Sequence, residues 1–226
     1  MDLKSKWGPI VNCVADLLGS RVEVVLHDVS RPERSIIMIR NGHVTGRTLG
    51  APLTDLGFYM LRESEHKIET LGVYRSKTDN GKLLQCNAVN LRDAHGKIEA
   101  ILCINIDVTG DGKQVNDQRT ITPAEHYQTN IDQVIETMIS DARRTVNGRL
   151  NRDSQFELVR AMDTRGVFLA RESVRKVASA LEIAAPTIYK YIQLARRERA
   201  TARINAKSER TPIELALSRR RGKERV

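Results

Sequence analysis

Aromatic side chains are scarce in this chain of 226 residues, where Phe, Trp and Tyr make up 4% of the sequence. Proteins that bind single-stranded nucleic acid stack bases on aromatic rings, so the scarcity argues against that class. The sequence also lacks an apolar run of about 18 residues, which argues against a transmembrane helix. Its N-terminus has no unbroken apolar stretch and no cleavage-like end, so we expect no secretion signal.

Cysteine is also rare, with three widely spaced residues at Cys13, Cys86 and Cys103. An odd number without a CxxC pair indicates neither a disulfide framework nor a metal knuckle. A reducing, cytoplasmic location is therefore the expectation. Cys86 and Cys103 lie in apolar segments that read as strands, which favours a place in the core over a role as nucleophile.

Catalytic and metal-binding patterns are missing as well. The five histidines are scattered without a ligand spacing such as HExxH, so we expect no metal. Gly42, Gly46 and Gly50 are evenly spaced, but no GK[ST] follows, so they are expected at turns rather than around a phosphate. No nucleophile–base pair is apparent either, and we expect neither an enzyme nor a cofactor.

Positive charge is present and unevenly distributed. The chain carries a net charge of +9, yet residues 1–110 hold 14 Lys and Arg against 13 Asp and Glu. Residues 183–226 alone hold 12 against 4. A basic C-terminal region attracts a phosphate backbone through counterion release, and the alternative is a solvated basic tail.

The first 110 residues read as one α+β unit. A helix is expected over 4–18, with Ile10, Val14, Leu17 and Leu18 on its inner side, and a second over 52–69. Period-2 and β-branched segments predict an antiparallel sheet with helices on one face. The predicted strands are 21–29, 36–40, 72–77, 83–92 and 98–108, with 43–50 as a return strand or loop.

The remaining chain reads as helical. Residues 110–123 are polar and turn-rich, which is typical of a linker. An apolar stripe over 131–146 is typical of a packing helix, and its place between two domains would also suit a dimer contact. The predicted division is a first domain over 1–110, a linker and connecting helix over 111–150, an all-α domain over 151–199 and a mobile basic tail over 200–226.

The segment 174–191 predicts two short helices joined by a tight turn. Val174, Val177 and Leu181 fall at helical spacing and form an inward stripe, and Ala178 is small enough for a close helix crossing. Glu182 stands in the turn where such motifs usually carry glycine. This pattern favours a helix-turn-helix over a plain helical hairpin.

The second of these helices would present the residues that contact DNA. Pro186 suits a first helical turn, and residues 188 and 192 would pack back on the first helix. Bases or nearby phosphates would be contacted by Thr187, Tyr189 and Lys190, and phosphates by the arginines that follow. The full predicted DNA-binding set is Ala185, Pro186, Thr187, Tyr189, Lys190, Arg196, Arg197 and Arg199.

Several blocks together resemble a bacterial family that joins a YheO-type PAS-like domain to a C-terminal helix-turn-helix. They are EVVLHD (23–28), NGHVTGRTLGAPLT (41–54), LRDAHGKIEAILCINID (91–107), RGVFLARESVRKVASAL (165–181) and PTIYKY (186–191). The resemblance implies a transcriptional regulator, of which the D-arginine utilisation repressor is the best-described kind. It also implies a sensory PAS-like fold with an inner cavity.

Such a cavity would be lined by inward polar residues of the sheet, which need partners when buried. A zwitterionic amino acid could supply them. Asp28 or Asp107 would hold an ammonium or guanidinium group, and Arg47 a carboxylate, although all of these could instead cap loops. The candidate ligand residues are His27, Asp28, Arg47, Asn90, Asn105 and Asp107.

The preferred interpretation is a ligand-responsive regulator that binds double-stranded operator DNA as a homodimer. A dimer is expected because the second helix of the helix-turn-helix, the reading helix, contacts too few bases in a single copy. A small molecule, for which an amino acid is one candidate, would bind the first domain and bias the helix over 124–147. Two alternatives remain. One is a signalling protein whose helical hairpin binds a protein partner, and the other is a small-molecule enzyme.

Overall fold

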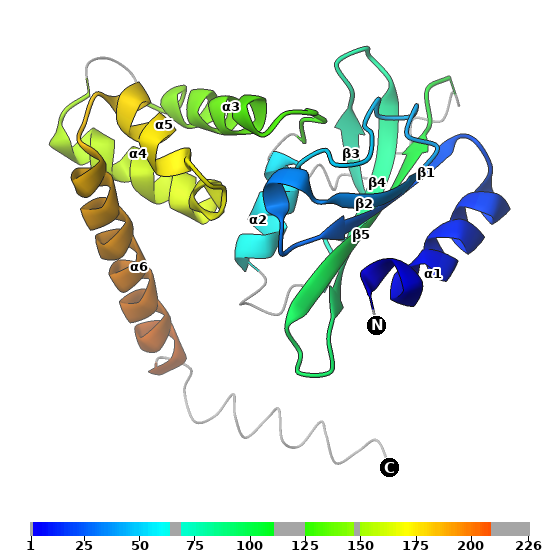
Figure 1. The fold of residues 1–226 in the computed structure, drawn as a ribbon. Coiled ribbons are helices and arrows are strands. Elements are labelled where there is room, and N and C mark those ends of the chain that lie inside the picture. The colour runs from blue at the N-terminus through cyan, green and yellow to red at the C-terminus, as the bar shows by residue number, and fades with distance from the viewer. Residues whose placement is uncertain (1, 64–68, 111–124, 147–149, 209–226) are drawn as a thin grey trace.

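The structure is a computed structural model that describes residues 2–63, 69–110, 125–146 and 150–208. An antiparallel sheet with flanking helices is followed by an all-helical part, as the sequence predicted (Figure 1). The first part contains α1 (Leu3–Leu18), β1 (Val22–Asp28), η1 (Pro32–Arg34), β2 (Ile36–Arg40), α2 (Asp55–Glu63), β3 (Tyr74–Lys77), β4 (Leu83–Arg92) and β5 (Ile98–Asp107). The second contains α3 (Ile131–Arg143), α4 (Arg152–Thr164), η3 (Val167–Leu169), α5 (Ser173–Leu181) and α6 (Ala185–Ser208).

The five strands form one sheet in the order β2-β1-β5-β4-β3, and every neighbouring pair is antiparallel. Side chains alternate between the two faces along each strand. In β1, Glu23 therefore lies on the same face as His27, which is the inner face, the one toward α2. The register places Glu23 opposite Asn105 of β5. Residues 41–50 contain no strand; they form the turns that connect β2 to the segment before α2.

Helices cover both faces of the sheet, so the expectation of helices on one face was wrong. Helix α1 packs against the outer face, over β1 and β2, whereas α2 lies on the inner face (Figure 1). Of the predicted inner stripe of α1, Val14 packs against the sheet, but the other three residues do not. Gly8, Val11 and Ala15 are buried, while Leu17 is 80% exposed.

Small residues explain this orientation of α1. A Cβ atom on Gly8 would lie 3.3 Å from the Met38 sulfur, so glycine here lets the helix approach β2 closely. Helical periodicity identifies apolar positions, but it does not show which of two adjacent apolar stripes faces the sheet. The stripe of small side chains faces it, and larger residues such as Ile10 remain 44% exposed.

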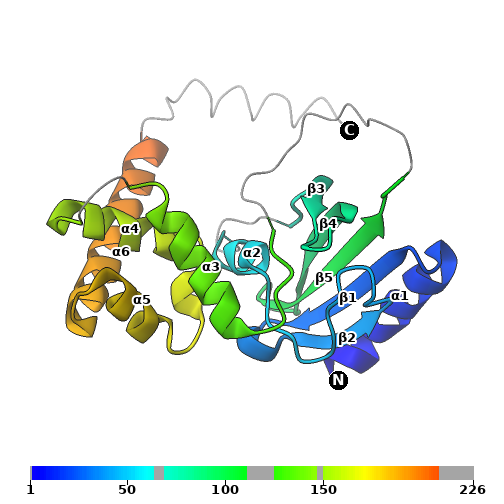
Figure 2. The same cartoon turned by 90° about the horizontal axis from the view of Figure 1, so that it is seen from above.

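The helical part packs on the inner side of the sheet part through one continuous core. Phe58 of α2 and Ile101 of β5 belong to the same buried cluster as Met138 of α3, Leu158 of α4 and Ile188 of α6. Figure 2 shows α3 between α2 and the other C-terminal helices. The apolar stripe of α3 is therefore buried within the chain, so it is not available for the dimer contact considered for it.

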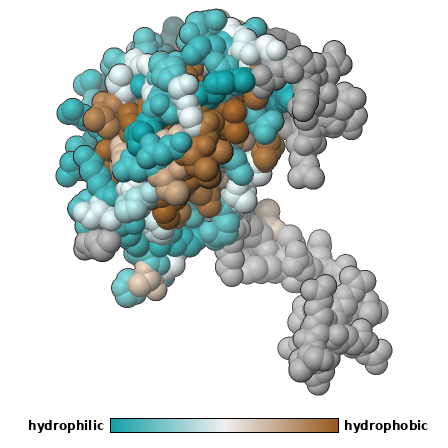
Figure 3. Space-filling view, turned by 90° about the vertical axis from the view of Figure 1, so that its right-hand side faces the viewer, coloured by the Kyte–Doolittle hydropathy of each residue, from teal (hydrophilic) through white to brown (hydrophobic). Residues whose placement is uncertain are grey.

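On the opposite side, the outer face retains partly exposed apolar residues beside α1. Figure 3 views this side and shows an apolar patch at its centre. Leu91, Leu102, Ile104 and Ile106 are partly buried there, against the cluster that contains Val11 and Ala15.

The domain boundaries predicted from the sequence remain predictions. The predicted linker over 110–123 lies, apart from Gly110, outside the described residues. The predicted mobile tail begins inside helix α6, which continues to Ser208, and residues 209–226 are outside the described part.

Candidate functional site

Helices α5 and α6 form the predicted helix-turn-helix. Val177, Leu181, Ile188 and Ile192 are buried, and Ala178 is 8% exposed at the crossing. The turn closes with two backbone hydrogen bonds at the end of α5. The Glu182 N–H donates to the Ser179 carbonyl, and the Ile183 N–H donates to the Ala178 carbonyl. This bonding defines a Schellman motif, whose left-handed position is usually glycine.

Glu182 occupies that left-handed position, with φ of 55° and ψ of 41°. A side chain there costs about 1 kcal/mol or more in backbone strain. The turn geometry therefore matches the helix-turn-helix pattern even though its residue does not. The unusual glutamate lowers the stability of the turn without changing its path.

The first turns of α6 expose a continuous polar face. Pro186, Tyr189 and Lys190 are exposed, with Tyr189 at 57%, whereas Ala185 and Thr187 are only partly so. A helix N-terminus also carries unpaired N–H groups and a partial positive charge, which favour contact with phosphate. This end of α6 can therefore enter a groove while residues 188 and 192 hold it on α5.

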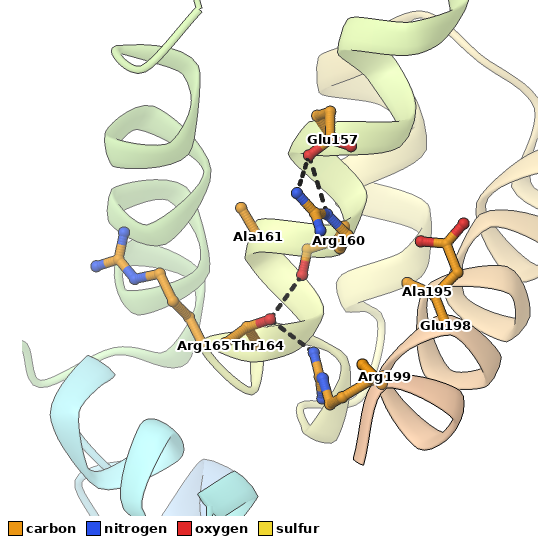
Figure 4. Close-up of a pocket in the computed structure, with 9 residues that line it drawn as sticks. Glu157, Arg160, Ala161, Thr164, Arg165, Ala195, Glu198 and Arg199 are labelled. Atoms are coloured by element: carbon orange, nitrogen blue, oxygen red, sulfur yellow. Dashed lines mark hydrogen bonds and ion pairs between the residues drawn. The ribbon is translucent and has the colours of Figure 1, made fainter. Parts of the chain in front are cut away.

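The three arginines predicted to hold phosphates do not behave alike. Arg197 is exposed, as that role requires. Arg196 and Arg199 instead pair within the chain. The Arg196 Nη2 atom lies 2.8 Å from the Asp163 Oδ1 atom, and the Arg199 Nη2 atom lies 2.6 Å from the Thr164 hydroxyl oxygen, as Figure 4 shows for Arg199. In this conformation, neither is a ready phosphate ligand.

A pocket of about 580 Å³ separates α4 from α6 beside these pairs (Figure 4). Arg160 on its wall pairs with Glu157 one turn away, and Arg199 closes its lower edge against Thr164. Of its charged residues, Glu157 and Arg160 pair with each other, and Arg165 and Arg199 pair with aspartates outside the pocket.

The structure gathers some, but not all, of the predicted ligand residues. His27, Arg47 and Asn105 are 2–4% exposed and belong to one buried polar region on the inner side of the sheet. Asp28 and Asp107 lie at the rim. Each accepts a hydrogen bond from the backbone two residues later, at 2.9 Å, as the loop-capping alternative predicted.

Asn90 and His27 are also buried, and His27 has a side-chain partner. Asn90 is 4% exposed on β4, opposite Ile101, and belongs to the inner face. The His27 Nδ1 atom lies 2.8 Å from the Ser35 hydroxyl oxygen. Burial, and secondarily the charge of Arg47, lowers the pKa of His27 well below its usual value, so the imidazole is neutral.

Two buried carboxyl groups that the sequence analysis missed dominate this region. Glu23 is fully buried and accepts hydrogen bonds from Asn105 at 2.9 Å and from the Thr45 hydroxyl at 2.7 Å. Glu125 accepts hydrogen bonds from the hydroxyls of Thr54 and Tyr74 at 2.8 Å and of Tyr127 at 2.9 Å. Burial raises the pKa of both carboxyl groups.

A sequence signal existed for Glu23 but not for Glu125. A glutamate between valines in a strand, at a period of two from His27, predicts an inward carboxylate. Glu125 follows the polar segment 110–123, where charged residues usually face solvent. Only the tertiary structure places Glu125 against the inner face of the sheet.

Arg47 is the buried cation of this region. Its Nη2 atom donates to the Pro52 carbonyl, while its Nε atom has no hydrogen-bond partner among the described residues. A buried unpaired donor costs about 1–3 kcal/mol, so this atom points to a missing acceptor. Burial lowers the pKa of Arg47, which the nearby charges of Glu125 and Glu23 oppose.

Glycine lets the Arg47 backbone reach this position. A Cβ atom on Gly42 would lie 2.5 Å from the Arg47 carbonyl oxygen. Gly46 and Gly50 have φ near 80°, so the three evenly spaced glycines serve turns, as predicted. Cys86 and Cys103 lie nearby, and burial raises the pKa of both thiols, which keeps them protonated.

One further cluster joins the two parts of the chain. Asp55, His126 and Asp141 place one ligand atom each within 4.8 Å of one another, a spacing that could hold a metal ion. The Arg165 guanidinium, however, lies 3.1 Å from Asp141 and 3.9 Å from Asp55. A cation already balances the carboxylates, so we assign the cluster to ion pairing.

Comparison with known proteins places both parts of the chain. A family model of the YheO-like PAS domain matches residues 3–117, and a model of a helix-turn-helix domain matches residues 130–193. The chain belongs to the YheO-like PAS family. A PAS-like domain joined to a helix-turn-helix is the organisation of a DNA-binding transcriptional regulator.

Similar proteins cover nearly the whole chain. An uncharacterized protein of Haemophilus influenzae is 28% identical over 86% of this chain and 91% of its own length. YheO of Escherichia coli K12, also uncharacterized, is 25% identical over 85% and 84%. The transcriptional regulator DauR of Pseudomonas aeruginosa is 24% identical over 81% and 90%. Among the described helices, none combines the length and apolar character needed to cross a membrane.

Proposed function

We propose that this protein is a cytoplasmic, ligand-responsive repressor that binds operator DNA as a homodimer and controls amino-acid metabolism genes. The observation that carries the proposal is the shared core. It connects the exposed reading helix, which packs on α4 and α5, to a domain with a buried polar site. The similarity to DauR, named as a transcriptional regulator, supports the same function.

The effector we propose is an amino acid with a cationic side chain. Its carboxylate would pair with Arg47, whose Nε atom lacks a partner, and Asn105 would lie beside it. Its cationic group would pair with Glu125 or Glu23. These replace the roles first expected of Asp28 and Asp107, which are engaged with their own turns.

Glu125 also offers a route from effector to DNA. It precedes the first residue of α3 by six positions, and α3 packs against α4 and α5. A ligand that pairs with Glu125 would withdraw this carboxyl from Tyr74 and Thr54 and move the chain that leads into α3. The expected regulatory step is thus a shift of α3 under the helix-turn-helix.

Operator binding tests the function as a whole. The purified protein is titrated with duplex DNA from its own upstream region and with an unrelated duplex of equal length, at two salt concentrations. At the higher salt concentration, we expect the protein to bind the upstream duplex more tightly than the unrelated duplex. If both duplexes bind equally and the higher salt concentration abolishes binding, the proposed role of α6 in sequence recognition is rejected. If neither duplex binds, the protein-partner alternative is favoured.

Two variants separate reading from positioning. Lys190→Ala should weaken binding to the upstream duplex by about 1–3 kcal/mol and leave binding to the unrelated duplex nearly unchanged. Arg197→Ala should weaken both equally and reduce the salt slope by about one. An equal loss on both duplexes for Lys190→Ala would reject its contact with bases.

Calorimetric titration with L-arginine, D-arginine and L-alanine tests the effector site. Arg47→Gln should abolish binding of all three, because each offers a carboxylate. Glu125→Gln should remove only the preference for arginine. His43→Gln, outside the buried region, is the control. Unchanged affinities in both site variants would reject this site.

For the dimer, we propose the outer sheet face as the contact between two copies. The α3 stripe is buried, and the outward residues of β4 and β5 are mostly uncharged. The exception, Glu99, is already paired with Lys6 of α1, so two such faces can meet with little repulsion. The uncharged residues that would form the contact are Gln85, Asn87, Val89, Leu91, Leu102, Ile104 and Ile106.

Light scattering on Ile104→Lys tests this contact. The variant should be monomeric and still folded by circular dichroism, whereas Leu169→Lys in the helical part should remain dimeric. A dimeric Ile104→Lys protein would place the contact elsewhere.

A further inference from the structure

One buried carboxylate joins the PAS-like domain to the reading helix. Asp163, in the last turn of α4, is 1% exposed. Arg62 of α2 places Nη2 3.1 Å from its Oδ2 atom and donates from Nε to its backbone carbonyl at 3.2 Å. Arg196 of α6 donates from Nη2 and Nε to Oδ1, at 2.8 and 3.1 Å, and Arg199 lies 3.4 Å from Oδ2.

The close approach of α2 to this point has a second, independent cause in the backbone. Gly166, just after α4, has φ of 82°, and a Cβ atom there would lie 2.5 Å from the Phe58 carbonyl oxygen. Glycine is therefore required where the turn after α4 meets α2. The ion cluster sits at a contact that the backbone has already made tight.

The position of each arginine on α6 decides what it can do. Arg199 continues the buried stripe of Ile188, Ile192 and Ala195 and is 19% exposed. Arg196 lies two turns after Tyr189 and so follows the same face of the helix, with 49% of its side chain exposed. Arg196 can therefore reach either Asp163 or an external anion.

We infer that Asp163 is a positioning residue for DNA binding: it withholds Arg196 and Arg199 from DNA phosphates and fixes α6 against α2 through Arg62. The carboxylate occupies the place that a phosphate group would take, because both offer two oxygen atoms to the paired N–H groups of a guanidinium. DNA phosphate and Asp163 then compete for Arg196. Any shift of α2 that withdraws Arg62 changes how tightly Asp163 holds the reading helix.

The inference rests on the proposed function and makes a prediction that DNA binding alone does not make. Each phosphate contact adds about 0.9 to the slope of log K against log salt concentration. Arg196→Ala should leave that slope unchanged, because Arg196 is already paired, whereas Arg197→Ala should reduce it by about one. An equal reduction by both substitutions would overturn the inference.

Releasing the arginines gives the converse test. Asp163→Asn should increase the slope by about one to two, because Arg196 and Arg199 become available to phosphates, and should lower the ratio of upstream to unrelated binding. The double variant Asp163→Asn with Arg196→Ala should lose about one unit of that increase. A merely structural role for Asp163 would weaken binding without steepening its salt dependence.

Arg62→Ala tests the connection to the PAS-like domain. It should lower the ratio of upstream to unrelated binding without changing the salt slope, because Arg62 is not on the reading helix. Arg160→Ala, which breaks an exposed pair on α4, is the matched control and should change neither. An Arg62→Ala protein indistinguishable from this control would overturn the link to α2.

Folding and function remain separable in this design. Circular dichroism identifies any variant that is unfolded, and if Asp163→Asn is unfolded, the comparison of Arg196→Ala with Arg197→Ala still decides. If the unaltered protein does not prefer its upstream duplex, the proposed function fails. If it does, and Arg196→Ala matches Arg197→Ala, only the present inference fails.

Discussion

Glu125 and Asp163 are both buried carboxyl groups in the region where the sheet part meets the helical part, but their partners differ. Glu125 accepts hydrogen bonds from three neutral hydroxyl groups, those of Thr54, Tyr74 and Tyr127. Asp163 is surrounded by the guanidinium groups of three arginines. Among the described residues, Glu125 has no cation within ion-pair distance, although Arg47 lies in the same buried region, whereas Asp163 has three.

This difference separates a site that can receive a ligand from one that fixes structure. Burial raises the pKa of Glu125, and a ligand cation would relieve that cost. Asp163 is already matched, so removing it leaves buried guanidinium groups without an anion. The same residue chemistry would thus serve the proposed sensing at one position and the proposed positioning at the other.

The largest expected effect comes from Asp163→Asn. The variant should lose about 3 kcal/mol of unfolding free energy, because breaking a buried ion pair strands the opposite charge. Urea unfolding measures the loss. Glu157→Gln, which breaks an exposed pair on the same helix, should cost less than about 0.5 kcal/mol. Equal losses in the two variants would remove the distinction between the two carboxyl sites.

Glu125→Gln should have the opposite sign. The pKa of the Glu125 carboxyl group is higher in the folded protein than in the unfolded chain. The protein with Glu125 therefore loses stability as pH rises from the unfolded pKa through the folded pKa. The amide does not titrate, so the variant should be more stable by on the order of 1 kcal/mol at pH 8 and by nothing at pH 4.

The pH series on Glu125→Gln also has a clear contrary outcome. If the variant is less stable at pH 8, the carboxylate is ionised and paired with Arg47, and the contrast with Asp163 disappears. Glu136→Gln, which removes a carboxyl group from the exposed surface of α3, is the control.

Glu182→Gly should stabilise the helix-turn-helix by about 0.5–1 kcal/mol, because glycine adopts the left-handed conformation without strain. Thermal unfolding checks this increase. Glu182→Ala retains the side-chain strain and should give no increase, so a comparable gain from alanine would contradict the backbone explanation.

His126→Gln should have the smallest effect. The hydrogen bond to Asp55 raises the pKa of His126, so protonation stabilises the native protein at low pH and this contribution is lost as pH rises through the folded pKa. The free energy of unfolding of the unsubstituted protein should therefore be larger than that of the variant at pH 6 and equal to it at pH 9. A difference independent of pH would reject the ionic contact, and His95→Gln in an exposed hairpin is the control.

Local sequence patterns predicted the elements well where a period or a turn residue fixes the backbone. Strands β2 and β4 begin and end at the predicted residues, and Val177, Leu181, Ile188 and Ile192 face inward as their spacing required. The orientation of α1 was not predictable, because the small Gly8 and Ala15 rather than the larger apolar residues face the sheet. Glu182 could be flagged as unusual, but its left-handed conformation required the structure.

The sequence by itself determined the α+β fold followed by a helix-turn-helix, the inward polar position Asn105, and the exposed Tyr189 and Lys190, since alternation and helical spacing are local properties. Only the tertiary structure decided that Glu125 joins Arg47's buried region and that Asp163 engages Arg62, Arg196 and Arg199. Those contacts join residues 33 to 101 positions apart in the chain, and no local period specifies which distant charges a fold brings together.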